Sequence, residues 1–167
     1  LAAMGRRSNV DWLSIENAGV DLNEAGLPVF DPNTMQCGES RVFIAGDIAA
    51  LNPVLHEAAD EGRIAGYNAA RQNSTAFKRK TPFAITFTSP NICTIGASFD
   101  SLDPGTIEIG EMRLGPVGRA LIMGVNRGII RIYVDKSTGI LKGATLVAAR
   151  GENLAHLLAW CIDEQMT

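Results

Sequence analysis

A short apolar run that stops at a glycine–aspartate pair constrains this chain more than any other feature. The run is Val42-Phe43-Ile44-Ala45, which is β-branched and aromatic at its start, and Gly46-Asp47 closes it. This pattern is typical of a buried parallel strand that ends in a turn. Asn52 and Pro53 then favour a helix, with Asn52 as N-cap and Pro53 as the first helical residue. We expect this helix to run from Pro53 to about Gln72.

The strand end and the helix start together predict a ligand site. Open α/β sheets bind ligands at the carboxyl ends of their strands, so Asp47 could accept hydrogen bonds from sugar or ribityl hydroxyls. Backbone amides at Val54, Leu55 and His56 would favour an anion, because the first turn of a helix leaves its N–H groups without carbonyl partners. Taken alone, a glycine–aspartate pair after a strand fits an ordinary turn equally well.

One face of the expected helix carries small residues. They are Ala58, Ala59, Gly62, Gly66 and Ala69. A glycine inside a helix costs about 1 kcal/mol relative to alanine. We therefore interpret this face as one that packs closely against a sheet or a bound cofactor.

The second half of the chain predicts an antiparallel unit. Strands are expected at 83–88, 92–95, 106–114, 128–134 and 140–149, with a hairpin turn at 135–139 and an ordinary turn at 115–119. Apolar residues at helical spacing predict an amphipathic helix from about Glu152 onward. The polar, basic stretch from Asn73 to Lys80 is expected to be a linker. The predicted fold class is an α+β domain, an antiparallel sheet plus helices, preceded by part of an α/β domain.

Composition and charge argue against several kinds of partner. The 167 residues are 46% apolar, which is enough for a real core, and the net charge of −3 argues against nucleic acid. No apolar stretch approaches the roughly 20 residues of a membrane span. The three cysteines are odd in number and widely spaced, which indicates neither a disulfide framework nor a metal site and fits the cytoplasm. We expect Cys37, Cys93 and Cys161 to be small buried or half-buried residues.

Both ends of the chain suggest that it is part of something larger. It starts at Leu1 without a methionine, and it ends at Thr167 in helix-like sequence without a capping signal. We therefore expect the two ends to be cut.

The segment around Gly46-Asp47 resembles the second flavin-binding motif of the class I pyridine nucleotide–disulfide oxidoreductases, in particular the dihydrolipoamide dehydrogenase type. In that family a hydrophobic strand ends in Gly-Asp, and the next helix reads Leu-Ala-His-Lys-Ala-x-x-Glu-Gly, which stands here as Val54-Leu55-His56-Glu57-Ala58-Ala59-Asp60-Glu61-Gly62. The resemblance implies that Asp47 binds the ribityl chain of FAD and that the Leu55 and His56 amides contact the flavin ring. Gly46 and Val54 complete the predicted site. The departures are Leu55 for alanine and Glu57 for lysine.

Further segments resemble the same family in the same order along the chain. Met4 to Asn9 is similar to the family's Gly-Arg-x-Pro-Asn motif, with Ser8 in place of the proline. In the family this motif stands where the chain leaves the NAD domain. Thr88, Pro90 and Gly96 match the opening of the family's interface domain. The resemblance implies that residues 1–80 are the C-terminal portion of an FAD-binding domain, with 1–9 as the exit from the NAD domain. It implies that 82–167 are an interface domain that lacks its C-terminus.

The sequence lacks the motifs that carry out the family's reaction. There is no Gly-x-Gly-x-x-Gly, no Cys-x4-Cys pair and no His-Pro-x-x-x-Glu, so we predict no catalytic residue. His56 and His156 are expected to be structural, and Glu152 is expected to cap a helix. The resemblance implies FAD, with NAD bound elsewhere in the intact enzyme, and no metal.

The intact enzyme is expected to be a homodimer through residues 82–167 that oxidises dihydrolipoamide with NAD, with a lipoyl-bearing multienzyme complex as a further partner. The 167-residue chain alone is expected to be inactive. Two alternatives stay open. The chain could act only as a dimerisation module, or the enzyme could be a relative such as mercuric reductase, glutathione reductase or the soluble pyridine nucleotide transhydrogenase.

Overall fold

The computed structural model describes Gly5 and residues 7–167, and these form two compact units. The first unit ends at Arg79 and the second begins at Lys80. Each unit has its own cluster of buried hydrophobic residues. Within the described residues, none of the helices has the length and apolar character that crossing a membrane requires.

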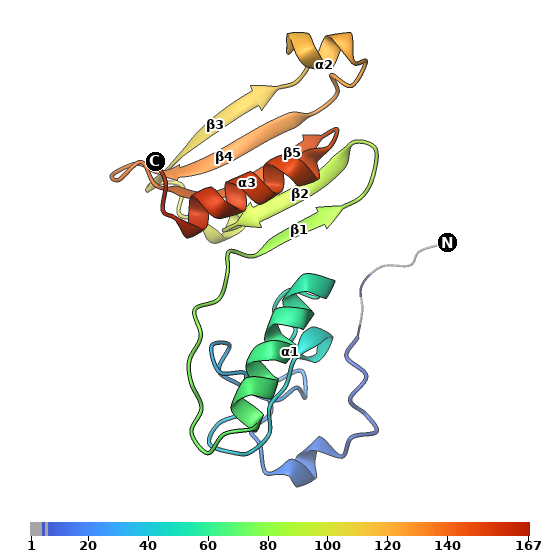
Figure 1. Ribbon diagram of the computed structural model, residues 1–167, viewed down its shortest axis with the longest axis vertical. Coiled ribbons are helices and arrows are strands. Elements are labelled where there is room, and N and C mark those ends of the chain that lie inside the picture. The colour runs from blue at the N-terminus through green and yellow to red at the C-terminus, as the bar shows by residue number, and fades with distance from the viewer. Residues whose placement is uncertain (1–4, 6) are drawn as a thin grey trace. The chain divides into compact units, whose positions relative to one another are not determined.

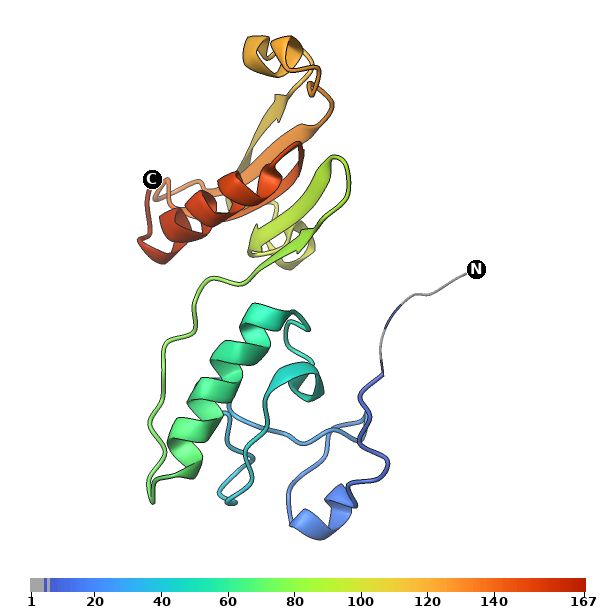
Figure 2. The same ribbon diagram turned by 45° about the vertical axis from the view of Figure 1, so that its right-hand side comes forward.

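The second unit is a five-stranded antiparallel sheet with the strand order β1-β2-β5-β4-β3 (Figure 1). The strands are β1 (Phe83–Thr86), β2 (Asn91–Gly96), β3 (Ile107–Arg113), β4 (Ile129–Asp135) and β5 (Leu141–Ala148). Helix α3 (Gly151–Asp163) lies along one face of the sheet, as both views show (Figures 1 and 2). It contacts β1, β2 and β5. The predicted antiparallel sheet plus helices is confirmed.

Small residues bring α3 close to this sheet. Cys93 pairs with Leu146 and Ile95 pairs with Ala144 across β2 and β5, so these buried side chains form one continuous apolar surface. Ala155 and Ala159 are the buried positions of α3 that pack on it. The helix predicted from about Glu152 is present. Of its predicted apolar residues, Leu154, Leu158 and Ile162 pack against the core, whereas Leu157 is exposed.

Two short helices of the second unit were not predicted. One is a 3₁₀ helix, η3 (Phe99–Ser101), and the other is α2 (Gly118–Ile122), which Figure 1 shows at the end of the sheet between β3 and β4. The sequence predicted a turn at 115–119. This helix is only five residues long, and the turn-forming residues Gly115, Pro116 and Gly118 predict a turn there instead.

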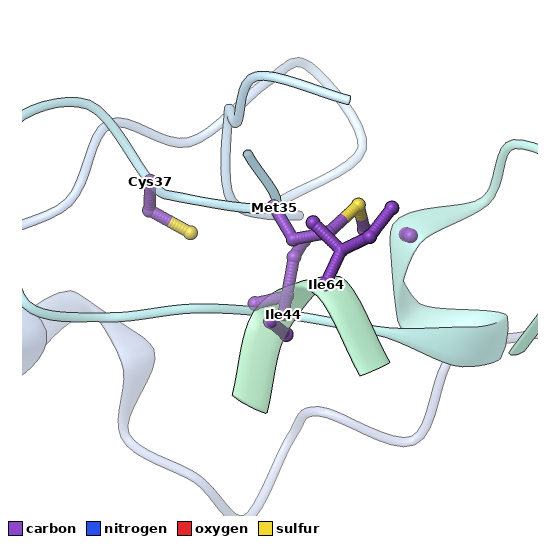
Figure 3. Packing of buried hydrophobic residues seen from close by; sticks show 6 residues of the cluster. Met35, Cys37, Ile44 and Ile64 are labelled. Carbon is purple, nitrogen blue, oxygen red and sulfur yellow. The ribbon is translucent and has the colours of Figure 1, made fainter. Parts of the chain in front are cut away.

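The first unit contains one long helix, α1 (Leu55–Ala69), and two 3₁₀ turns, η1 (Ile15–Ala18) and η2 (Gly46–Ala49). Its core consists of Met35, Cys37, Ile44, Ala49, Ile64 and Ala65. Figure 3 shows Met35, Ile44 and Ile64 grouped together, with Cys37 nearby. The side chain of Ile64 comes from α1, so this core fixes the helix against the loops.

The parallel strand predicted at Val42–Ala45 is wrong. Phe43 forms a single antiparallel bridge with Gln36, flanked by the bonds from Ile44 N–H to Met35 O at 3.0 Å and from Cys37 N–H to Val42 O at 2.9 Å. A parallel ladder needs neighbouring strands that run in the same direction. Gly5 and residues 7–79, the described part of this unit, supply no such strand. The segment is nevertheless buried at Ile44, as the apolar run indicated.

The predicted start of the long helix is also wrong. Its N-cap is Val54 rather than Asn52, and no side chain caps it. The Val54 N–H donates to Asn52 O at 2.7 Å, and this tight turn holds Val54 in an extended conformation. The helix therefore begins after Pro53. At the other end, the Arg41 guanidinium donates to Ala69 O at 2.9 Å and to Arg71 O at 2.5 Å, which satisfies carbonyls that a helix end leaves open.

The stretch predicted as a linker is attached to the first unit up to Arg79. The Asn68 side chain is fully buried, donates to Thr34 O at 2.9 Å and Thr75 O at 3.0 Å, and accepts from Thr75 N–H at 2.9 Å. Phe77 packs against the hydrophobic core, and its N–H donates to Asn33 O at 2.9 Å. These contacts hold the segment that follows α1 against the first unit.

Candidate functional site

The Gly46-Asp47 turn is built by a change of backbone direction at the end of the apolar run. Ala45 is extended, Gly46 has φ +80, and the 3₁₀ turn η2 follows immediately. A positive φ of this size favours glycine because it has no Cβ. A Cβ at Gly46 would lie 3.6 Å from the Ala58 Cβ, an ordinary contact, so the backbone conformation rather than a lack of space requires glycine here.

A cavity of about 550 Å³ lies beside this turn. It is lined by Gly5, Arg7, Ser8, Asp47, Ala50 and Pro53. The Ser8 hydroxyl donates to Asp47 O at 3.3 Å, which holds the N-terminal segment against the turn. Of the predicted site residues, Asp47 lines this cavity. Met4 and Arg6, which belong to the predicted Met4–Asn9 motif, lie outside the described residues.

The first turn of α1 follows this cavity directly, since Pro53 lines it and the helix begins at Leu55. The amides of a first helical turn have no acceptor one turn earlier, and the helix dipole makes this end positive. The prediction that the backbone amides of Val54, Leu55 and His56 bind a ligand fails at Val54. The Val54 N–H is already bonded to Asn52 O and is not available to a ligand. Leu55 and His56 are the exposed residues of the first turn.

Glu61 connects the turn to the helix, and its role was not predicted from the sequence. Its Oε2 accepts a hydrogen bond from the Gly46 N–H at 2.7 Å, and the residue is only 1% exposed. Arg79 Nη2 lies 3.3 Å from Glu61 Oε1. One signal could have revealed this cluster. Glu57 and Glu61 are one helical turn apart, where like charges repel, so a cation partner was to be expected.

Glu57, the acidic departure from the family pattern, is compensated by the same arginine. Arg79 Nη2 lies 2.7 Å from Glu57 Oε2, and its Nε lies 3.8 Å from Asp60 Oδ2. Glu57 is buried and is held by Arg79. Its negative charge is therefore balanced beside the start of α1.

His156 and Glu152, the polar residues predicted to be structural, contact neighbouring residues of the second unit. His156 Nδ1 lies 2.7 Å from Glu152 O, and its ring packs edge-on against Phe83 at 4.8 Å. The Glu152 carboxylate accepts a hydrogen bond from the Asn91 amide, and Arg150 rather than Glu152 occupies the N-cap position of α3. The expectation that Glu152 caps this helix is therefore wrong.

The three cysteines are unpaired thiols, and their positions agree with the sequence prediction. Cys37 and Cys93 are buried and Cys161 is half-buried. Burial raises the pKa of the Cys37 thiol. It also raises the pKa of the Cys93 thiol, and the negative charge of Glu152 adds to that shift. Across Gly5 and residues 7–167, no three histidine, cysteine or acidic side chains are placed to hold a metal ion.

A solved structure shares the fold of this chain, and a family match over its second half shows the class of protein. The fold is similar to that of the HOCl-induced flavoprotein disulfide reductase RclA from Escherichia coli, which superposes with a TM-score of 0.79 over 98% of this chain and 38% of its own, at 22% identity. The chain belongs to the pyridine nucleotide-disulphide oxidoreductase family, whose dimerisation domain matches residues 82–167. The family resemblance seen in the sequence is thus confirmed.

Among the curated relatives that match almost the whole chain, two carry different names. One is the dihydrolipoyl dehydrogenase of Haloferax volcanii, which is 31% identical over 98% of this chain. The other is the NAD(P)H dehydrogenase (quinone) of Mycobacterium tuberculosis, which is 27% identical over 100% of this chain. In both cases the match covers 34% of the relative, so this chain spans about a third of the length of the proteins it resembles.

Proposed function

We propose that this chain supplies one half of a flavin cradle and most of a dimer interface to an FAD-dependent oxidoreductase of the dihydrolipoamide dehydrogenase type. The observation that carries the proposal is the position of Asp47, on a cavity that also borders the entry to α1. Residues 1–80 would form the flavin-binding portion and residues 82–167 the interface domain. Membership of the family supports this division.

The residues around the cavity have the chemistry that FAD requires. The Asp47 carboxylate is an acceptor for ribityl hydroxyls, and the amides of Leu55 and His56 would be donors to the flavin ring. The positive end of α1 would favour negative charge on the reduced ring by about 0.3–1 kcal/mol. When bound, FAD supplies the electron-transfer chemistry. The protein residues named here bind and orient it.

The proposed reaction of the intact enzyme is the oxidation of dihydrolipoamide, with NAD as the final acceptor. The name of the Haloferax volcanii relative supports this substrate, and a lipoyl-bearing multienzyme complex would then be a partner. Quinone reduction is the second candidate, because the Mycobacterium tuberculosis relative with that name matches the whole chain. Parallel assays with dihydrolipoamide plus NAD and with NADH plus a quinone would separate the two reactions.

The proposed dimer uses the second unit. The family match is to a dimerisation domain, and helix α3 exposes Leu157 at 55% and Trp160 at 70% of their surfaces. Large apolar side chains that are grouped on one surface are typical of protein–protein contacts.

We predict that Asp47→Ala weakens FAD binding in the full-length protein that contains this chain. Loss of a charge-assisted hydrogen bond of about 1.5–3 kcal/mol lowers affinity by roughly 10- to 100-fold. Flavin content after dialysis, measured from visible absorption, reports the effect. Asp21→Ala, which removes an exposed carboxylate of the same unit, is the control. Retention of stoichiometric flavin by Asp47→Ala would refute the assignment.

The 167-residue chain without further sequence is expected to bind FAD weakly, because its sequence contains no Gly-x-Gly-x-x-Gly loop for the ADP half of the cofactor. The same absorption measurement on the purified chain tests this expectation. A colourless chain that forms dimers supports the proposed division of roles between its two units. Stoichiometric flavin on this chain would contradict it.

A further inference from the structure

A buried carboxylate lies directly behind the Gly46-Asp47 turn. Glu61 is almost fully enclosed, and its neighbours on the inner face of α1, Ile64 and Ala65, belong to the hydrophobic core. A charged group is costly to bury unless it is paired and hydrogen-bonded, and apolar residues of similar volume often serve as well or better for stability. The presence of glutamate here therefore points to a specific hydrogen-bonding task.

That task is visible in the contacts of the two carboxylate oxygens. Oε2 accepts the N–H of Gly46 at 2.7 Å, and Oε1 lies 3.3 Å from Arg79 Nη2. The Gly46 N–H lies on the peptide that follows the extended residue Ala45, and it donates to this side chain. A half-buried backbone donor needs a partner, and the Glu61 carboxylate provides one.

Arg79 holds the carboxylate in place from the other side. Besides Glu61 it contacts Glu57 Oε2 at 2.7 Å, and its Nη1 lies 3.4 Å from Met35 Sδ. The guanidinium thus joins α1 to the loop that carries Met35. A planar group with several donors can hold two carboxylates in a fixed arrangement, which a single ammonium group does less well.

We propose that Glu61 is a positioning residue for the turn and that Arg79 is its support. The Glu61 carboxylate fixes the peptide that carries the Gly46 N–H, and Asp47 is the next residue, so its direction toward the cavity follows from this hydrogen bond. Substitution of Glu61 would then release the turn while the core of the unit stays packed. The effect on cofactor binding rests on the proposed function of Asp47, whereas the effect on the turn does not.

The first test measures the turn itself, without a cofactor. Amide hydrogen exchange at Gly46 is followed by NMR in the ¹⁵N-labelled 167-residue chain. Glu61→Ala is expected to accelerate exchange at Gly46 by about tenfold or more, as befits the loss of one charge-assisted hydrogen bond. Glu61→Gln keeps an oxygen acceptor and should give a smaller acceleration. Glu39→Gln, at an exposed site of the same unit, is the charge-matched control and should leave Gly46 unchanged.

A variant of Arg79 tests whether this residue holds the Glu61 carboxylate in place. Arg79→Met is expected to accelerate exchange at Gly46, and Lys78→Met, which removes the neighbouring exposed charge, is expected to leave it unchanged. This pair keeps the proposal testable if Glu61→Ala does not fold. Exchange at Gly46 that stays at the wild-type rate in the folded Glu61 and Arg79 variants would overturn the proposal.

The third measurement separates this inference from the cofactor assignment. In the full-length protein, FAD retention is compared for Asp47→Ala and Glu61→Ala. If both lose flavin and Gly46 exchanges faster, positioning of the turn for the cofactor is supported. If Gly46 exchanges faster but Asp47→Ala retains its flavin, the proposed function fails and the role of Glu61 in the turn stands. If Asp47→Ala loses flavin while Glu61→Ala matches wild type in both measurements, the inference fails alone.

Discussion

At the scale of single residues, burial controls the chemistry of the three cysteines. The thiolate is the reactive form of cysteine, and burial disfavours it because a charge is poorly solvated inside the protein. Cys37 and Cys93 both have a raised pKa for this reason. Cys161 on α3 is half-buried.

We predict that Cys161 is alkylated by iodoacetamide before the other two cysteines at mildly alkaline pH. Cys37 and Cys93 should react only as fast as the protein unfolds, so urea should abolish the difference. Peptide mass spectrometry at successive times measures each site separately, and Cys161→Ser removes the fast phase. Alkylation of Cys93 in the folded chain at the rate of Cys161 would contradict the prediction.

The key residues of the site differ in how far the sequence reveals them. Gly46 and Asp47 were predicted because a local pattern marks them. The role of Arg79 was not, because its partners Glu61 and Glu57 are 18 and 22 residues away in the sequence. Periodicity within a helix reports which residues share a face, but it does not identify a partner that returns from a distant segment.

At the scale of elements, the hairpin between β4 and β5 depends on one carboxylate. Asp135 Oδ1 accepts hydrogen bonds from the Ser137 hydroxyl at 2.6 Å, the Ser137 N–H at 3.0 Å and the Thr138 N–H at 2.9 Å. These bonds, with that of the Ser137 hydroxyl as the largest contribution, hold the pKa of Asp135 well below its usual range. Gly139 closes the turn with φ +74.

We predict that this turn makes stability fall at acid pH. A carboxyl group with a lowered pKa in the folded state contributes stability that is present above its unfolded pKa of about 3.9 and is lost as pH falls further toward the folded value. Asp135→Asn removes this titration, so its free energy of unfolding should be lower than wild type at neutral pH and should decrease less below about pH 4.

Urea unfolding at neutral pH and at about pH 3 measures both effects. Asp100→Asn changes an exposed aspartate of the same unit and should follow the wild-type pH dependence. Parallel curves for wild type and Asp135→Asn between the two pH values would exclude the proposed contribution.

Helices and strands that depend on interactions within their own unit were predicted well from the sequence, and those that depend on other segments were not. The strands of the second unit pair with strands of the same unit, so alternation and turn residues were sufficient. Val42–Ala45 has the composition of a parallel strand, but the strands that would pair with it are not among the described residues, and it forms one antiparallel bridge instead. The helix start shifted because the turn from Asn52 to Val54 competes with capping.

At the scale of the whole molecule, self-association is the property that the second unit should confer. Trp160 is the largest of the exposed apolar side chains of α3. Large aromatic residues at the centre of an interface often contribute 2 kcal/mol or more of binding energy, which corresponds to about a 30-fold change in affinity.

We predict that Trp160→Arg weakens dimerisation by about 30-fold or more, because a charge replaces a large exposed aromatic side chain on the proposed interface. Sedimentation analysis over a range of concentrations gives the dissociation constants. Trp12→Arg is a matched control, since Trp12 is 88% exposed and belongs to the first unit. Equal dissociation constants for wild type and Trp160→Arg would place the interface elsewhere.

The family could be identified from the sequence, whereas the reaction could not. The flavin motif depends on backbone geometry, which a glycine and an aspartate at fixed spacing specify. The reaction depends on nucleophiles and proton carriers, and neither a Cys-x4-Cys pair nor a His-Pro-x-x-x-Glu motif occurs in these 167 residues. Relatives with two different names each match nearly the whole chain.

The buried side chain of Asn68 imposes a further requirement on the chain. Its nitrogen donates to two carbonyl oxygens, and its oxygen accepts from one N–H. Aspartate has the same shape, but its carboxylate has no hydrogen to donate and would face both carbonyls with negative charge. Position 68 therefore distinguishes two isosteric side chains by hydrogen-bond polarity alone. Conversion of this one amide to a carboxylate would therefore remove both donor hydrogens and weaken the attachment of the segment after α1 to the helix.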